Sequence, residues 1–109
     1  AADATNILAQ WVAPFDVEVT GIDIYGHDAV TGADTNTTHF NFQDETATPV
    51  EKANIDLTSG VNLVAGTKKA LTVTKFNLDA GKSLRMEREK IGTGLAVGGG
   101  VVVVTYRAR

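Results

Sequence analysis

The chain has 109 residues, of which 43% are hydrophobic and 21% are charged, and it carries a formal net charge of −3. This size and composition are typical of one globular domain and exclude a disordered or fibrous chain. Cysteine is absent, which excludes disulfides, thiolate nucleophiles and cysteine-based zinc sites.

Hydrophobic and polar residues alternate along most of the chain, and turn residues recur at short intervals, which predicts an all-β protein. The first strand is predicted over residues 5–12 and ends at Ala13-Pro14, since proline cannot donate a ladder hydrogen bond. The second strand is predicted over residues 15–25. Its apolar side chains change parity at Gly21, so a β-bulge there is predicted to turn all of them toward the core.

The third strand is predicted over residues 37–43, after a polar loop, and the fourth over residues 51–57. Alternate side chains of both strands are expected to point inward: Phe40 and Phe42 in the third, and Ala53, Ile55 and Leu57 in the fourth. His39 and Asn41 are expected to point outward. A short fifth strand is predicted over residues 61–65 and is followed by a turn at Gly66-Thr67.

The sixth strand is predicted over residues 70–77 and the seventh over residues 83–89, with Leu84 and Met86 buried. The turn between them requires a positive backbone angle at Gly81. The eighth strand is predicted over residues 101–107 and begins with four consecutive valines, which are apolar on both faces. Because such a strand promotes aggregation at a sheet edge, it is predicted to lie in the middle of a sheet.

These elements predict a single-domain antiparallel β-sandwich of about eight strands, jelly-roll-like in its arrangement, although other sandwiches with similar strand counts also fit. Residues 7–109 are predicted to form the sandwich domain, and residues 1–6 precede it as a short polar stretch. No apolar run is long enough to span a membrane, and no membrane partner is expected. The N-terminus lacks the basic start and apolar stretch of a signal peptide, so a mature product made in the cytoplasm is expected.

Charge is strongly segregated along the chain. The first 67 residues hold ten acidic residues against the single basic Lys52, a charge of −9, while the last 42 residues carry +6. These acidic and basic blocks are expected to fold onto each other or to meet across a subunit boundary, which favours self-association or docking. Nucleic-acid binding is not expected, because Glu87 and Glu89 interrupt the basic residues and few aromatic rings lie among them.

No group of residues identifies a reaction, and we predict no catalytic residue, no cofactor and no metal ligand. The nearest approach to a metal site is a polar loop that contains His27, Asp28, Asp34 and Asn36. It lacks a third and fourth ligand at the usual spacing and does not match an EF-hand, so a solvated loop is the preferred interpretation.

Three further patterns also lack the residues that their chemistry needs. The carboxylate pairs Asp44-Glu45 and Glu87 with Glu89 are considered for glycoside hydrolysis. Adjacent side chains point in different directions, and Glu87 and Glu89 alternate with Arg88 and Lys90 as on an exposed, solvated face. Ser59 and Ser83 have no nearby histidine and lie in no nucleophile elbow. The glycine-rich stretches 92–94 and 98–100 lack the lysine and hydroxyl residue of a phosphate-binding loop, so a flexible connection between strands is expected.

Two surface patterns complete the candidates. The stretch Asn36-Thr37-Thr38 matches a glycosylation acceptor, but the match is taken as accidental without a secretory signal. Four aromatic side chains lie near predicted strand ends and would be able to stack on sugar rings: Trp11, Phe15, Tyr25 and Tyr106. A carbohydrate-binding module is therefore kept as an alternative function.

Five stretches combine turn and strand patterns in an order that covers nearly the whole chain. They are residues 11–21 (WVAPFDVEVTG), 31–36 (TGADTN), 57–64 (LTSGVNLV), 78–84 (LDAGKSL) and 90–95 (KIGTGL). Together they resemble the small structural proteins of tailed bacteriophages. Among these the sequence is most similar to the capsid decoration, or cement, proteins.

This resemblance implies a non-enzymatic β-sandwich that commonly sits as trimers on the outside of the phage head. It also implies that residues 1–6 form a flexible N-terminal arm that reaches a neighbouring molecule. It implies that the partner is the major capsid protein. The decoration protein binds it where capsomers meet and stabilises the head against internal pressure. The protein is then expected in the virion, at the capsid surface, after synthesis in the host cytoplasm. A tail or head-fibre component is the alternative within the virion.

Overall fold

The computed structural model of the chain describes residues 4–44, 50–95 and 97–109. These residues form eight β-strands: β1 (Ala4–Val12), β2 (Val17–Gly26), β3 (Thr38–Asp44), β4 (Glu51–Asp56), β5 (Lys68–Ala70), β6 (Phe76–Leu78), β7 (Ser83–Lys90) and β8 (Gly100–Ala108). Within this part of the chain, no helix is long and apolar enough to cross a membrane.

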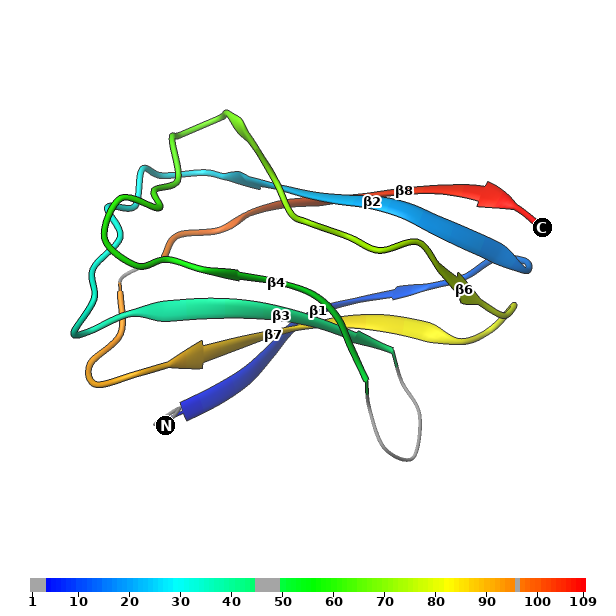
Figure 1. Cartoon of the computed structure of the whole chain (residues 1–109), viewed down its shortest axis with the longest axis horizontal. Helices are drawn as coiled ribbons and strands as arrows, with labels where there is room; N and C mark the ends of the chain where they lie inside the picture. The colour runs from blue at the N-terminus through cyan, green and yellow to red at the C-terminus, as the bar shows by residue number, and fades with distance from the viewer. Residues whose placement is uncertain (1–3, 45–49, 96) are drawn as a thin grey trace.

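The strands form two antiparallel sheets that pack face to face. The first sheet has the order β1-β7-β3-β4. In the second sheet β2 is central, with β8 along one side and the short β5 and β6 sharing the other side. Figure 1 shows β2 and β8 side by side in one layer and β1, β3 and β7 in the other. The structure confirms the predicted single-domain antiparallel β-sandwich.

The core lies between the two sheets and contains the side chains that the alternation predicted to point inward. The first sheet contributes Phe40, Phe42, Ala53, Ile55, Leu84 and Met86, and the second contributes Val17, Val19, Ile22 and Ile24. Burying each large aliphatic or aromatic side chain stabilises the fold by about 1.5–3 kcal/mol. Burial of both halves of β2 depends on its bulge, because the register with β8 shifts between Val19 and Gly21. The predicted bulge is confirmed.

A second register shift lies in the pairing of β3 with β4, and it removes Lys52 from the regular alternation of side chains along β4. In the pairing with β3, Phe42 lies opposite Ala53 but Gln43 lies opposite Glu51, so Lys52 is the extra residue. Its Nζ lies 5.4 Å from the ring centroid of Phe76 in the second sheet and 3.8 Å from Oδ2 of Asp44. The Lys52 side chain therefore covers the β4 edge of the core.

Two predicted strands are wrong, one in its existence and the other in its extent. Residues 61–65 form no strand, and their only described pairing is the isolated bridge between Val30 and Leu63. The strand predicted over residues 70–77 is two short strands, β5 and β6, which both pair with β2. The large apolar residues of this segment fall on odd-numbered positions up to Val73 and on even-numbered positions from Phe76. Between these two residues the chain lies outside the sheet.

The predicted position of the last strand is also wrong. Among the described residues β8 pairs only with β2, so it is an edge strand and not a central one. Val102 and Val104 pack against the core, whereas Val101 and Val103 are 61% and 40% exposed. A run of valines predicts that both faces are covered, but it cannot tell whether the cover comes from the same chain.

The chain ends and the turn before β7 complete the fold. Of the arm predicted at residues 1–6, Ala4 to Asn6 begin β1 and pair with β7, and residues 1–3 lie outside the described residues. Gly81 has the predicted positive backbone angle, with φ of 80°. The amide of Gly81 donates to the carbonyl of Ala13, so this turn also fastens the end of β1.

The acidic and basic blocks meet within the molecule at the C-terminal end of β8. The guanidinium of Arg107 lies 2.7 Å from the Glu18 carboxylate, and that of Arg109 lies 3.8 Å from Asp16. Arg109 also pairs with Asp79. The first two ion pairs join the acidic block to the basic block, so the two blocks do fold onto each other here.

Candidate functional site

The outer surface of the first sheet carries rows of polar side chains that cross three strands. We call this surface the polar face. It consists of His39, Asn41 and Gln43 of β3, Glu51, Asn54 and Asp56 of β4, and Arg85, Glu87 and Glu89 of β7. Each row forms because residues that lie opposite one another in paired strands point to the same face of a sheet. Outward-pointing His39 and Asn41 were predicted and are confirmed.

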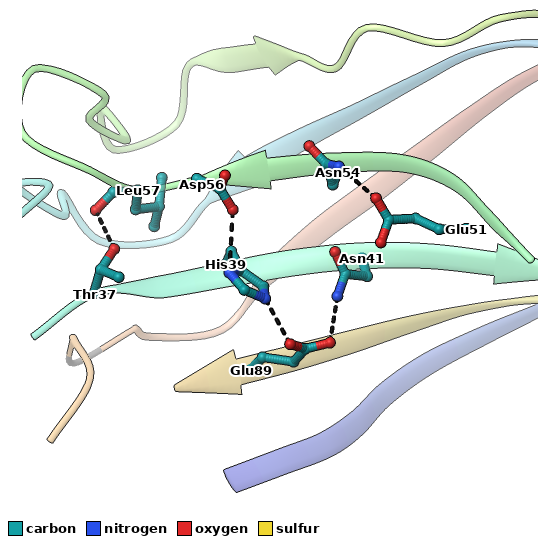
Figure 2. Close-up of polar contacts among 8 residues, drawn as sticks. All are labelled: Thr37, His39, Asn41, Glu51, Asn54, Asp56, Leu57 and Glu89. Carbon is teal, nitrogen blue, oxygen red and sulfur yellow. Dashed lines mark hydrogen bonds and ion pairs between the residues drawn. The ribbon is translucent and has the colours of Figure 1, made fainter. Parts of the chain in front are cut away.

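His39 occupies the middle of one row, between two carboxylates from neighbouring strands. Its Nε2 lies 2.7 Å from Oε2 of Glu89, and its Nδ1 lies 3.1 Å from Oδ1 of Asp56. Figure 2 shows the ring bridging β4 and β7 in this way. A neutral imidazole donates from one nitrogen only, so only the doubly protonated ring donates to both carboxylates.

The centre of the polar face is buried although it lies on the outside of the sandwich. Asn41 is 6% exposed and Glu87 is 9% exposed. The Asn41 amide donates to Glu89 (Figure 2), and the Gln43 amide donates to Glu87 over 3.2 Å. Arg85 reaches Glu87 over 3.1 Å and also donates to Oε1 of Gln43. The buried Asn41 amide and Glu87 carboxylate thus each have a partner that offsets their desolvation. The Nε of Arg85 is buried without a hydrogen-bond partner in the described residues.

The polar face is acidic and its side chains are held in fixed positions. It carries four carboxylates and one guanidinium, in addition to His39. The Asn54 amide donates to Glu51 at its β4 side, which extends the hydrogen bonding to the edge (Figure 2). Side chains that are already ordered lose little rotamer entropy on binding. The surface is therefore suited to docking against a complementary basic surface.

Two of the loop residues considered as metal ligands, Asp34 and Asn36, form hydrogen bonds that join neighbouring loops. Oδ1 of Asp34 accepts from the backbone amide of Ser59 over 2.8 Å, and Oδ1 of Asn36 accepts from that of Thr93 over 3.1 Å. The Asp28 carboxylate lies beside Gly98. The described residues contain no cluster of three or more histidine and acidic side chains arranged to hold a metal ion.

The described residues of the two carboxylate pairs take part in separate polar contacts. Glu87 and Glu89 share the polar face, but each accepts from a different amide of β3. Asp44 lies beside Lys52, and Glu45 lies outside the described residues. Gly92 and Gly94 have positive φ angles in the connection between β7 and β8, where the sequence predicted a loop.

Three of the four candidate aromatic side chains gather at one end of the sandwich. The rings of Trp11 and Tyr106 have centroids 5.0 Å apart and planes tilted by 41°, and Phe15 meets Tyr106 edge-on at 6.1 Å. We call these three residues the aromatic cluster. Its rings pack against one another and do not lie parallel in one plane. Tyr25 lies apart from them, along a cleft between the sheets.

That cleft is a hollow between the two sheets that was not predicted. It has a volume of about 790 Å³ and lies between β7 and β3 of the first sheet and β8 of the second. Phe40, Phe42 and Met86 line one wall and Val102 and Val104 the other. Arg88 also lines it, and the Nε of Arg88 is buried without a hydrogen-bond partner in the described residues. We call this hollow the open cleft.

Sequence reasoning assigned Arg88 to a solvated face because it alternates with Glu87 and Glu89. The parity shows otherwise, since Arg88 follows Leu84 and Met86 at intervals of two and lies opposite Phe40 in β3. The spacing of two from Leu84 and Met86 was visible in the sequence, but the charge of Arg88 favoured a solvated position.

The chain was also compared with known proteins. No protein family model, no curated protein and no solved structure matches it.

Proposed function

We propose that the protein is a phage capsid decoration protein, which binds the outer surface of the assembled head and stabilises it without catalysing a reaction. The major capsid protein is its partner, and the capsid surface of the virion is its location. The sequence resemblance supports this proposal, and the β-sandwich fold agrees with it. The observation that carries it is the polar face, an acidic surface of nine side chains held by hydrogen bonds across three strands.

The polar face favours adhesion to a repeating surface for two physical reasons. Its charged groups are fixed before binding, so a partner with matching basic groups meets an ordered surface. An exposed ion pair contributes only about 0.2–1 kcal/mol. One contact of this kind is weak, but a shell presents many copies of the same site, and contacts made together give far higher avidity. Binding is then selective for assembled shells.

The experiment is co-sedimentation of the purified protein with assembled heads of its phage and, separately, with unassembled capsid protein. The double variant Glu51→Lys/Asp56→Lys reverses two exposed charges of the polar face, whereas Asp23→Lys reverses one charge on the second sheet as a control. We expect binding to assembled heads that falls at least tenfold in the double variant and little in the control. Absence of binding to heads, or equal loss in both variants, would overturn the proposal.

Carbohydrate binding is the second candidate, and the aromatic cluster is the observation that favours it. Phe15 and Tyr106 are partly exposed at the same end of the sandwich. Sugar rings bind best to flat, accessible ring faces, and the mutual packing of these rings leaves less of each face free. Titration with a panel of glycans tests this function directly. Saturable glycan binding that is lost in Tyr106→Ala, without binding to heads, would establish it in place of decoration.

A further inference from the structure

Strand β8 leaves one backbone edge unpaired on the surface of the protein. In the described part of the chain it pairs with β2 along its whole length and with no strand on its other side. Edge strands of soluble proteins are usually protected by charged residues, proline or bulges. From Val101 to Tyr106 the strand carries none of these. The edge therefore offers free amides and carbonyls flanked by valine side chains.

The open cleft lies directly along this unpaired edge. All four valines of β8 line it, together with residues of β3 and β7 in the opposite sheet. A strand added beside β8 would continue the inner face of the second sheet and place alternate side chains over the cleft. An extended strand with apolar residues on both faces would therefore pair with the free edge of β8 and complete the cover of the core.

We propose that this partner is β8 of a second copy, paired antiparallel about a two-fold axis near Val103. The inference goes beyond the proposed function and does not depend on it. In this arrangement Val102 and Val104 of each copy extend the apolar inner face of the other. Val101 and Val103 of the two copies form one stripe on the outer face, which covers the valines that are exposed in the single chain.

The charged residues near the two ends of β8 favour antiparallel over parallel pairing of the two copies. With Val103 opposite its own equivalent, Arg107 lies opposite Gly99 of the second copy. The Asp28 carboxylate adjoins this point, since a Cβ placed on Gly98 would lie 2.3 Å from its Oδ2. Arg107 at the end of β8 in each copy thus lies near Asp28 beside the start of β8 in the other copy. Parallel pairing would instead place the two copies of Arg107 side by side, and like charges directly opposite are destabilising.

The symmetry of this contact differs from the trimer that the sequence resemblance implies. A strand that pairs with its own equivalent forms an isologous contact, which closes as a dimer. A three-fold ring needs two different surfaces on each copy. The oligomeric state of the free protein therefore distinguishes the two arrangements without any capsid.

The first test measures the mass of the full chain by sedimentation equilibrium over a range of concentrations. We expect a monomer–dimer equilibrium whose dissociation constant rises at least about tenfold in Val103→Lys, because two ammonium groups then face each other across the axis. The control Val50→Lys changes a valine of similar exposure beside β4, at the opposite edge of the sandwich, and should leave the constant unchanged. Circular dichroism and thermal melting establish that both variants are folded.

The second test is positive and does not require loss of binding. The chain has no cysteine, so Val103→Cys introduces a single thiol at the proposed axis, where directly opposed Cβ atoms lie about 4.5–5.5 Å apart. Mild oxidation should give a covalent dimer with Val103→Cys but not with Val50→Cys. A chain that stays monomeric, a trimer, or equal cross-linking of both variants would overturn the proposal. None of these results affects binding to heads, which is measured separately.

Discussion

The ring of Trp11 in β1 packs against the ring of Tyr106 in β8, with centroids 5.0 Å apart. These two strands belong to different sheets, and each pairs with a single neighbour in the described structure. The contact therefore joins the two sheets at the side of the sandwich where the open cleft also lies. Trp11 is partly buried against the core, so the pair combines apolar burial with an aromatic contact.

Trp11→Ala should lower the free energy of unfolding by about 2–3 kcal/mol, because it removes the contact that closes this side of the sandwich. Phe15→Ala is the matched control. Phe15 touches the same tyrosine but is 46% exposed, so its loss should cost about 1 kcal/mol or less. Urea denaturation followed by circular dichroism measures both. Equal losses in the two variants would mean that Trp11 does not hold the sheets together.

The ion pair at the centre of the polar face should contribute far more to stability than an exposed pair. Arg85→Met leaves the buried Glu87 carboxylate without its guanidinium, and an unpaired charge at such a position costs about 1–3 kcal/mol. Arg107→Met breaks an ion pair with Glu18, but the Arg107 side chain is 68% exposed. Its loss should cost less than about 1 kcal/mol.

Chemical denaturation of both arginine variants at neutral pH checks this expectation. The double variant Arg85→Met/Glu87→Leu supplies the control, since it removes both charged partners and should recover part of the lost stability. A double variant as unstable as Arg85→Met would show that the unpaired carboxylate is not the cause.

Most of the architecture could be predicted from the sequence because it depends on alternation and on glycine. Phe40 and Phe42 point inward as predicted, and the parity change at Gly21 predicted the bulge that buries both halves of β2. These features are local, since period two and the absence of a Cβ act within a few residues. The strand order depends on which distant segments pair, and no local pattern specifies that.

The polar face and the open cleft show why surfaces built from distant segments are harder to predict. His39, Asp56 and Glu89 lie far apart in the sequence and meet only because β3 pairs with both β4 and β7. The central position predicted for β8 is wrong, because apolar residues on both faces give the same pattern in a central strand and in an unprotected edge strand. The two cases are separated only by the pairing, since among the described residues β8 pairs with β2 alone.

Gly32 should be intolerant of any side chain because two carbonyl oxygens occupy the position of its missing Cβ. A Cβ there would lie 1.9 Å from the carbonyl oxygen of Thr58 and 2.4 Å from that of Val61. Gly32→Ala must displace backbone and should lower the melting temperature by several degrees, about 4–8 °C for each kcal/mol lost. In Gly99→Ala no atom lies within 4 Å of the new Cβ, so its melting temperature should match that of the unmodified protein. Differential scanning calorimetry compares the two, and an unchanged melting temperature for Gly32→Ala would contradict the packing described for this loop.

The proposed binding to phage heads should weaken as ionic strength rises, because the polar face is acidic and its outermost carboxylates are exposed to solvent. The Debye length is about 10 Å at 0.1 M salt and about 3 Å at 1 M, so attraction to basic groups of the shell is screened over this range. Pairing of β8 with a second copy depends on apolar contacts and backbone hydrogen bonds, and it should change much less over the same range. Co-sedimentation with heads and sedimentation equilibrium of the free protein, measured in the same salt series, separate the two contacts. Head binding that is insensitive to salt would mean that the shell is not held through the polar face.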